Sequence, residues 1–344
     1  MQWPWQGAVL KDVAVVSADE AWAVGVVSPV DHSGPLVSHY IDHAFHTVRT
    51  PLTDHQGAFR SIALLGGRPV IVGYDLGRAG KERHPVALRR THHGWRFMDT
   101  SAGDLPGGDF LSSVDVVSKA NAWAVGTAHD GTTTIALVLH WNGLRWSRIH
   151  VPIQGLGGLL AVDASSDDVW AVPTIQRSSI GQPATVLRLA GGAWQVVEVP
   201  VPTGSAGAYY TSVAERGPND VSLVGYALIE TPNGYDQRTL TSHWDGSTWT
   251  STVGPDAGGL AMYEGLAIGA NRTALAVGYS AAAPWYQRIS VADVGPTDAA
   301  WGQVPSMQKQ DMIFYAAGFV PGTCRAFVVG ITMAGEPIAF RSMW

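Results

Sequence analysis

Several residues that could perform acid–base or binding chemistry stand at a similar place in the sequence, just before a short apolar run. Among them are two carboxylic acids, Asp12 and Glu264, and one cation, Arg60. Neighbouring carboxylates and an arginine shift one another's pKa and can transfer protons or hold a polar ligand. We therefore expect Asp12 or Glu264 to act as an acid or base, and Arg60, Ser113 and Ser212 to bind the ligand. The alternative is that these residues only line a hydrated channel.

The histidines divide into two groups. His39, His140 and His243 each precede an aromatic residue in the same sequence context, and residues that recur in this way usually have a structural role. His55 lies in an irregular segment outside that pattern. Because histidine titrates near neutral pH, His55 is our third candidate for a catalytic acid or base. The alternative for His55 is an exposed loop residue without a function.

Aromatic residues form another set of candidates. Tyrosine and tryptophan offer amphipathic contact surface to ligands and to protein partners. The positions that we expect to bind a ligand are Tyr210, Tyr263, Trp285, Tyr286 and Tyr315. Anchoring of loops explains these residues equally well.

Motifs that would identify a particular chemistry are missing from the sequence. There is no HExxH zinc motif, no GxSxG nucleophile motif, no GxGxxG after an expected strand and no phosphate-binding P-loop. The single cysteine, Cys324, excludes an intrachain disulfide and a paired-cysteine metal site. The sequence therefore predicts neither a metal nor a cofactor.

The elements that position these candidates are indicated by a repeated apolar motif. Its clearest copy reads NAWAVG at 121–126, and the others are EAWAVG at 20–25, PVIVG at 69–73, DVWAVP at 168–173, VSLVG at 221–225, TALAVG at 273–278 and RAFVVG at 325–330. The residues that end successive copies are 47 to 53 positions apart. Repeats of this length indicate a propeller or a solenoid.

Each repeat unit contains four short apolar segments separated by turn residues. The third unit shows them as LSSVDVVS, NAWAVG, ALVLHW and LRWSRIHVP, with Asn-Gly at 142–143 in the position of a tight hairpin turn. Four antiparallel strands per unit are typical of a propeller blade. We predict an all-β fold, a seven-bladed β-propeller in a single domain, with blades at about 10–53, 54–103, 109–153, 157–206, 208–256, 259–307 and 309–344 plus 1–8.

The two ends of the chain suggest how the ring closes. The last unit has three apolar segments before Trp344, and the first residues, MQWPWQGAV, resemble an unpaired fourth strand. If the N-terminal strand completes the last blade, no sheet edge is left open at the junction. We therefore expect a closed ring rather than an open solenoid.

The repeat resembles a bacterial propeller family with WAVG…HWNG..W repeats, related to the kelch and Asp-box propellers. The residues that carry the resemblance are NAWAVG at 121–126, HWNGLRW at 140–146 and HWDGSTW at 243–249, and it extends over nearly the whole chain. It implies the propeller fold. SHWDGSTW at 242–249 departs from the Asp-box by one extra residue, and kelch repeats have a double glycine where this chain has one, so no catalytic residue is carried over.

One face of the predicted ring should carry loops that differ from blade to blade. The connections between the second and third strands and those between blades lie on this face, and they include 28–35, 75–85, 127–134, 174–183 and 227–238, which differ in length and composition. Variable loops on a rigid scaffold commonly carry function. We call this side the irregular-loop face and expect one asymmetric site there.

Charge and hydropathy restrict the partners. The net charge is −6 and no block of Lys and Arg occurs, so we expect no nucleic-acid binding. No apolar run reaches 18 residues, so we expect no membrane span. The start of the chain lacks a leader pattern, which favours a soluble cytoplasmic monomer. The alternative is a secreted protein whose leader has been removed.

Three functions are compatible with these observations. The first is a propeller with one asymmetric small-molecule or peptide site, which could be an acid–base enzyme of hydrolase, lyase or cyclase type. The second is a non-catalytic propeller that binds a protein on the same face. The third is a carbohydrate-binding lectin, which would need similar pockets in every blade. The sequence does not separate catalysis from binding.

Overall fold

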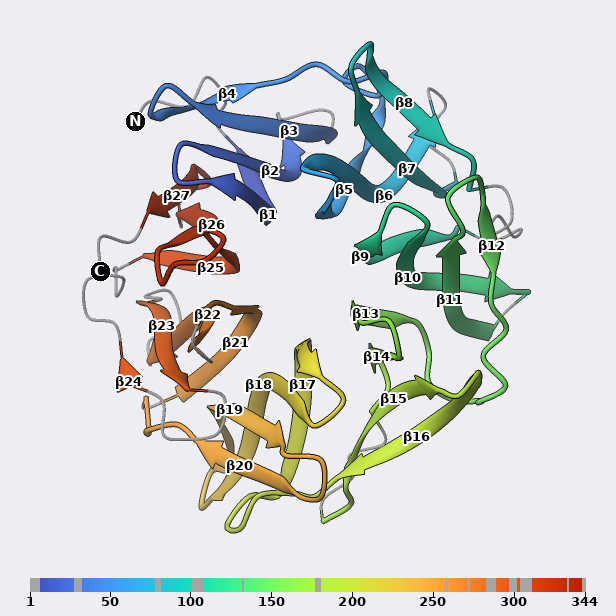
Figure 1. Ribbon diagram of the computed structural model, residues 1–344. Coiled ribbons are helices and arrows are strands. Elements are labelled where there is room, and N and C mark those ends of the chain that lie inside the picture. Colours follow the sequence, from blue (N-terminus) through green and yellow to red (C-terminus); the bar gives the residue numbers. More distant parts are fainter. Residues whose placement is uncertain are drawn as a thin grey trace.

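The strands of the protein are arranged in a ring, as the computed structural model shows (Figure 1). Of the 344 residues, it describes 7–27, 33–77, 82–100, 108–131, 133–176, 181–257, 259–270, 273–282, 289–296, 302–303, 311–332 and 334–341. All regular elements among these residues are β-strands. No helix that is long and apolar enough to cross a membrane occurs among them.

Four sheets of four strands follow one another along the first part of the chain, each with consecutive antiparallel strands. The first contains β1 (Ala8–Ser17), β2 (Glu20–Val27), β3 (Gly34–Ile41) and β4 (Ala44–Thr47). The second contains β5 (Gln56–Leu65), β6 (Arg68–Gly77), β7 (His84–Thr91) and β8 (Gly94–Met98). The third contains β9 (Phe110–Ser118), β10 (Asn121–Asp130), β11 (Thr133–Trp141) and β12 (Trp146–Arg148). The fourth contains β13 (Leu159–Ala164), β14 (Asp168–Pro173), β15 (Ala184–Ala190) and β16 (Ala193–Val199).

Two further sheets complete the ring. One has eight strands: β17 (Gly207–Gly217), β18 (Asp220–Thr231), β19 (Gly234–Trp244), β20 (Trp249–Val253), β21 (Gly259–Ile268), β22 (Thr273–Ala282), β23 (Ile289–Pro296) and β24 (Gly302–Gln303). The other has three: β25 (Met312–Phe319), β26 (Ala326–Thr332) and β27 (Pro337–Arg341).

The number of blades differs from the prediction. Counted by hydrogen-bonded sheets, the ring has six blades rather than seven. The difference arises because Gln237 of β19 pairs in parallel with Leu260 of β21, and this one pair joins β17–β20 to β21–β24. The all-β propeller with four antiparallel strands per blade is confirmed.

The ring closes where the first sheet meets the last. Strand β1 contacts β25, β26 and β27, and the N–H of Gly7 donates a hydrogen bond to the carbonyl of Gly335 (2.9 Å). The first and last described strands, β1 and β27, lie side by side on this side of the ring (Figure 1). The expected N-terminal fourth strand falls almost entirely on residues 1–6, which lie outside the described residues.

Large apolar side chains fill the spaces between neighbouring sheets. Trp123 of β10 packs with Leu159 and Val162 of β13, and Trp170 of β14 packs with Tyr210 of β17. Trp123 and Trp170 are 8% and 1% exposed. Burial of a side chain of this size contributes about 1.5–3 kcal/mol or more, so these contacts hold adjacent sheets together.

Two segments expected to be irregular loops are hairpins instead. Strands β10 and β11 pair as far as Asp130 and Thr133, and strands β18 and β19 pair as far as Thr231 and Gly234. The backbone ladder therefore extends these strands beyond the apolar core, where the sequence pattern alone had suggested loops.

The innermost strand of each four-strand group, and β25 of the last sheet, carries a bulge at the same place. Opposite the end of the repeated motif, one residue of the inner strand is left without a partner in the ladder. The bulged residues are Lys11, Arg60, Ser112, Leu160, Thr211, Glu264 and Tyr315. Bulges redirect side chains and are common beside functional sites.

Candidate functional site at the channel mouth

The bulged residues form the candidate site, because they occur on strands that surround the centre of the ring (Figure 1). Arg60 is exposed and Leu160 is 39% exposed, whereas Lys11, Glu264 and Tyr315 are half-buried. We call this set of seven positions the channel mouth. Its members differ in charge, size and polarity, so the mouth is chemically asymmetric.

Lys11, Glu264 and Tyr315 form one part of the mouth. The Lys11 Nζ atom lies 3.5 Å from the centre of the Tyr315 ring, a cation–π contact. Burial lowers the pKa of Lys11 to about 8, the charge of Glu264 opposes that shift, and the charge of Arg60 adds to it. Lys11 therefore carries a positive charge at neutral pH and loses it a little above.

Arg60 belongs to a neighbouring part of the mouth that contains a second arginine. The Arg60 guanidinium lies 5.1 Å from the centre of the Phe110 ring and 5.8 Å from that of Tyr74. The Arg83 guanidinium lies 5.5 and 5.0 Å from the same two rings. Arg60 was a predicted ligand-binding residue, whereas Arg83 was not identified from the sequence.

Three of the predicted polar residues occupy the position after the bulge. Asp12, Ser113 and Ser212 follow Lys11, Ser112 and Thr211. The Asp12 carboxylate accepts hydrogen bonds from the Ser61 hydroxyl (2.8 Å) and the Ile62 N–H (2.9 Å) of the next sheet.

Ser113 has the same kind of role, because its hydroxyl accepts a bond from the Val162 N–H (3.3 Å). At Asp12 and Ser113 this position joins neighbouring inner strands. Burial raises the pKa of Asp12 to about 6, against the opposing effect of its hydrogen bonds. Ser212 is half-buried at the equivalent position.

Two predicted ligand-binding tyrosines lie in the core instead. Tyr210 and Tyr263 are 1% and 3% exposed and precede the bulged residues Thr211 and Glu264. The Tyr210 hydroxyl is 2.7 Å from the Ser242 hydroxyl, and burial raises the Tyr210 pKa. Neither ring belongs to the mouth, whereas Tyr315 does. Trp285 and Tyr286 lie outside the described residues.

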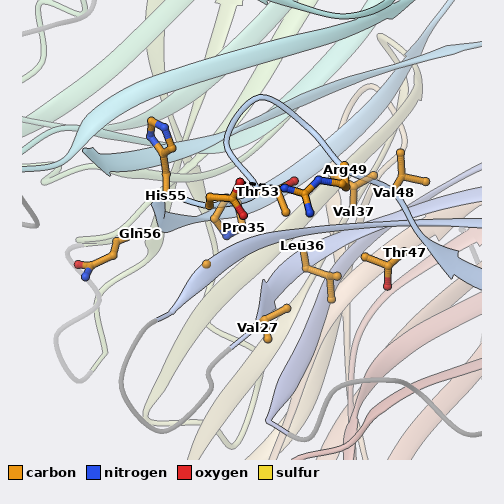
Figure 2. Close-up of a pocket in the computed structure, with 12 residues that line it drawn as sticks. Val27, Pro35, Leu36, Val37, Thr47, Val48, Arg49, Thr53, His55 and Gln56 are labelled. Carbon is orange, nitrogen blue, oxygen red and sulfur yellow. Dashed lines mark hydrogen bonds and ion pairs between the residues drawn. The ribbon is translucent and has the colours of Figure 1, made fainter. Parts of the chain in front are cut away.

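His55 lies apart from the bulged positions, beside a pocket. Its Nδ1 atom is 3.1 Å from the Asp75 carboxylate, and both side chains are largely buried. The pocket has a volume of about 340 Å³ and includes Leu36, Val37 and Val48 in its lining. Figure 2 shows His55 and Gln56 at one end of this pocket and Thr47 and Val48 at the other. A carboxylate at Nδ1 orients an imidazole so that Nε2 can exchange a proton.

Two further tyrosines, Tyr226 and Tyr279, were not identified from the sequence. The Tyr209 and Tyr226 rings stack at 5.1 Å with an interplanar angle of 16°, and Tyr279 is close enough to affect the Tyr226 pKa. Burial is the main cause of the raised Tyr226 pKa. A sequence signal existed, because a tyrosine directly follows the motif glycine in three repeats: Tyr74, Tyr226 and Tyr279.

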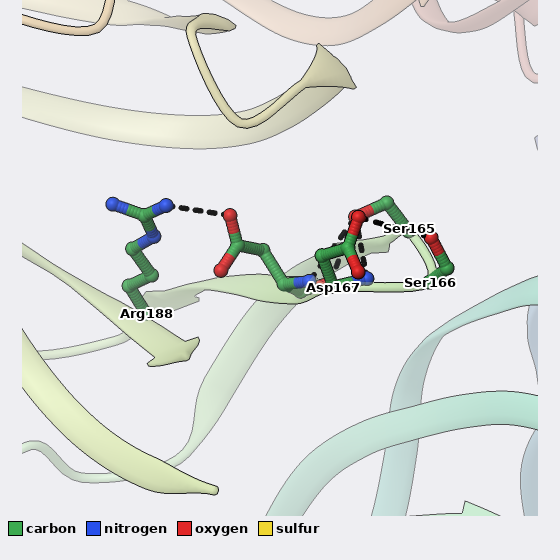
Figure 3. A network of polar contacts seen from close by, with 5 residues as sticks. Ser165, Ser166, Asp167 and Arg188 are labelled. Atoms are coloured by element: carbon green, nitrogen blue, oxygen red, sulfur yellow. Dashed lines mark hydrogen bonds and ion pairs between the residues drawn. The ribbon is translucent and has the colours of Figure 1, made fainter. Parts of the chain in front are cut away.

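A separate group of acids lies on three consecutive inner strands. Burial raises the pKa of Asp163 well above its ordinary value, and the charges of Asp115 and Glu215 raise it further. Burial also raises the pKa of Glu215 to about 7. Beside Glu215 lies the turn at Ser165–Asp168, where Arg188 donates to Asp168 (2.6 Å; Figure 3).

A metal site is not formed by these acids. Within the described residues, no group of three or more His, Cys, Asp or Glu side chains has an arrangement that could hold a metal ion. The prediction that the protein uses no metal remains a prediction.

Comparison with known proteins relates the chain to other propellers by shape alone. The sequence matches no protein-family model and no curated protein. Among solved structures, YCF48 bound to a D1 peptide is similar over 99% of this chain and 94% of its own, with a TM-score of 0.58 and 13% identity.

Two other solved structures have a similar fold. A polysaccharide lyase of family PL25, an ulvan lyase bound to -[GlcA(1-4)Rha3S]-, matches over 98% of this chain and 94% of its own, with a TM-score of 0.57 and 10% identity. YjhT matches over 88% of this chain and 98% of its own, with a TM-score of 0.52 and 11% identity. At these identities the likeness establishes the β-propeller fold and assigns no family.

Proposed function

We propose that this protein is a ligand-binding propeller with one asymmetric site at the channel mouth, and that its ligand is a small molecule or peptide with an anionic group. One observation carries the proposal: equivalent bulged positions hold different residues, with Lys11, Arg60, Glu264 and Tyr315 among them. Equivalent binding sites in all seven units would need similar residues at all seven bulged positions. The different residues found there favour one binding site for a single ligand.

The proposed scaffold is a ring of seven structural units, two of which share the eight-stranded sheet. Each pair of consecutive four-strand groups, including β17–β20 with β21–β24, encloses an apolar cluster, and so do the junctions with β25–β27. For example, Val224 of β18 packs with Tyr263 of β21 and Ala276 of β22 across the single parallel bridge. A packed core between the two groups supports two units rather than one.

An anionic ligand is favoured by the charges around the mouth. Lys11 and Arg60 bring two cations to it against the one carboxylate of Glu264, and Arg83 adds a third cation beside Arg60, although the net charge of the chain is −6. Cations concentrated in one region of an acidic protein attract anions and steer them to that region. Two solved propellers of similar shape contain a peptide and a saccharide, so both kinds of ligand are compatible with the fold.

Matched pairs of acidic and neutral probes test this function. Hexaglutamate and hexaglutamine form one pair, and trigalacturonate and its methyl ester form the other. We expect an acidic probe to bind, its neutral counterpart not to bind, and the affinity to fall as salt is added because ions screen exposed charges. Calorimetry measures each affinity.

The matched variants are Lys11→Gln and Lys119→Gln. Lys119 lies in the turn between β9 and β10, at the opposite end of the inner strand from the mouth, and serves as the control. Lys11→Gln should weaken binding while Lys119→Gln leaves it unchanged. Equal binding of acidic and neutral probes, or equal effects of both variants, contradicts the proposal.

The second candidate function is acid–base catalysis centred on His55, favoured by the His55–Asp75 pair beside the pocket. In this function His55 acts as the base and Asp75 holds the imidazole in position. Incubation with a metabolite extract, followed by NMR, should reveal consumption of a compound by the wild type and not by His55→Ala. Asp75→Asn should retain binding and slow turnover. An extract that the wild type leaves unchanged argues against catalysis.

A further inference from the structure

Two arginines from different segments converge on the same pair of aromatic rings, and we propose that Arg60 and Arg83 form a clamp for a carboxylate group of the ligand. This inference rests on the proposed function and deepens it by naming the group that is recognised. Arg60 is the bulged residue of β5, and Arg83 immediately precedes β7.

The geometry of the clamp is set by Tyr74 and Phe110. Their ring centres are 6.2 Å apart and the planes are inclined at 65°. Each guanidinium carbon lies within 6 Å of both ring centres, at 5.8 and 5.1 Å for Arg60 and at 5.0 and 5.5 Å for Arg83. Two permanent positive charges therefore lie beside the same pair of rings.

The charges of the clamp are not neutralised by the described part of the chain. There, neither Arg60 nor Arg83 forms an ion pair, whereas Arg49, Arg188 and Arg238 pair with carboxylates at 2.6–2.8 Å. Aromatic faces stabilise a guanidinium but supply no net negative charge. Because like charges repel and both side chains are exposed, an anion that contacts both guanidinium groups lowers the energy of the site.

The clamp is also anchored before a ligand arrives. The Asp109 N–H donates to the Arg83 carbonyl (3.0 Å), and the fully buried Asp109 carboxylate accepts from the His129 N–H (2.9 Å). These bonds fix the backbone of Arg83, and the aromatic rings restrict both arginine side chains. Because the arginine side chains are already restricted in the free protein, they lose less conformational entropy when the ligand binds.

A carboxylate is the group that fits this clamp. The planar guanidinium presents a fork of N–H donors that matches the two oxygens of a carboxylate, which a lysine ammonium cannot do. Two such forks suit a ligand with two neighbouring carboxylates, as in a dicarboxylic acid or consecutive acidic residues of a peptide. Phosphate can use the same donors and is therefore included in the test.

The experiment follows the arginine Nε–H signals by NMR while succinate, succinamide, inorganic phosphate or hexaglutamate is added. Arg60→Lys and Arg83→Lys keep the charge and remove the fork, and Arg96→Lys on the exposed part of β8 is the control. We expect succinate and hexaglutamate to shift the Arg60 and Arg83 signals and each clamp variant to weaken binding roughly tenfold or more. Arg96→Lys should have no effect.

The outcomes separate the clamp from the proposed function. If Lys11→Gln weakens hexaglutamate binding and the two clamp variants do not, the clamp is wrong and the channel-mouth site stands. Binding of phosphate without succinate overturns the choice of a carboxylate. If the wild type binds none of the acidic probes, the clamp and the proposed function both fail. Circular dichroism and urea unfolding establish that the variants are folded.

Discussion

Replacement of Gly126 by alanine tests how the bulge and the repeated motif are built. Gly126 ends the motif in β10 and lies opposite Leu111 of β9. A Cβ atom added here would lie 2.0 Å from the Phe110 carbonyl oxygen and 2.8 Å from the Leu111 Cα atom. Both are backbone atoms, so rotation of a side chain cannot relieve the contact.

The cost can be worked out from these distances. A carbon and a carbonyl oxygen approach to about 3.3 Å at the closest in ordinary contacts, so β9 and β10 must separate locally by about 1 Å. A ladder hydrogen bond of about 2.9 Å is lost when its atoms move that far apart. Two buried backbone groups without partners cost about 1–3 kcal/mol each. We therefore expect Gly126→Ala to lower the free energy of unfolding by about 2–6 kcal/mol, a large part of a typical stability.

The assay is urea unfolding monitored by tryptophan fluorescence, with Gly217→Ala as the matched control. A Cβ at Gly217 meets no atom within 4 Å, and the backbone there is not left-handed. The control should change the free energy of unfolding by less than about 0.5 kcal/mol. Since Phe110 belongs to the arginine clamp, Gly126→Ala should also weaken succinate binding. A change below about 1 kcal/mol in Gly126→Ala refutes the reasoning.

Three other predictions concern titratable groups. Binding of hexaglutamate should weaken as pH rises through about 8, because Lys11 then loses its proton, and Lys11→Arg should abolish this dependence in calorimetry. Asp12→Ala should reduce the free energy of unfolding in urea by about 2–3 kcal/mol, because the Ile62 N–H loses its acceptor. Glu215 has a folded-state pKa raised from 4.5 to about 7, so its protonated form stabilises the fold. That contribution is fully present below pH 4.5 and is lost as pH rises through about 7, and Glu215→Gln should remove this part of the pH dependence of thermal unfolding.

Each of these predictions has an outcome that contradicts it. Affinity for hexaglutamate that stays constant across the Lys11 pKa means that the amine does not take part in binding. Wild-type stability in Asp12→Ala means that its bonds between sheets are dispensable. The same pH dependence of unfolding in Glu215→Gln and the wild type shows that another group, such as Asp163, causes it.

The fold could be predicted because several local signals agree. Glycine at the end of the motif, Asn-Gly and Asp-Gly turns, and large apolar residues at fixed places all favour short antiparallel strands in repeated units. The count of sheets could not be predicted in the same way. The pair of Gln237 and Leu260 forms outside the repeated motif, where β19 extends beyond the core, and no sequence pattern specifies a single bridge.

The sequence indicated polar residues near the start of the inner strands, but it did not indicate the bulge among them. Arg60 and Glu264 occupy the bulged position, while Asp12, Ser113 and Ser212 stand one position later. A bulge inserts one unpaired residue, so the apolar pattern that resumes after it does not show which polar residue is unpaired. The arginine clamp was missed for another reason, since Arg83 meets Arg60 only through tertiary packing on Tyr74 and Phe110.

The residue before the bulge, the bulged residue and the residue after it have different structural roles. This difference explains why the bulged position varies most in chemical character. The residue before it is buried in every inner strand, as Leu10, Phe59 and Tyr210 show, and its size is restricted by the core. The residue after it joins neighbouring strands where it is Asp12, Ser61 or Ser113. The bulged residue between them is not buried in any inner strand, and side chains of several kinds stand there, although the Thr211 hydroxyl also donates to the Tyr263 carbonyl of the next inner strand (2.8 Å). A ring of such positions can acquire a binding site one residue at a time, and the lysine, arginine, glutamate and tyrosine found there are consistent with such a site.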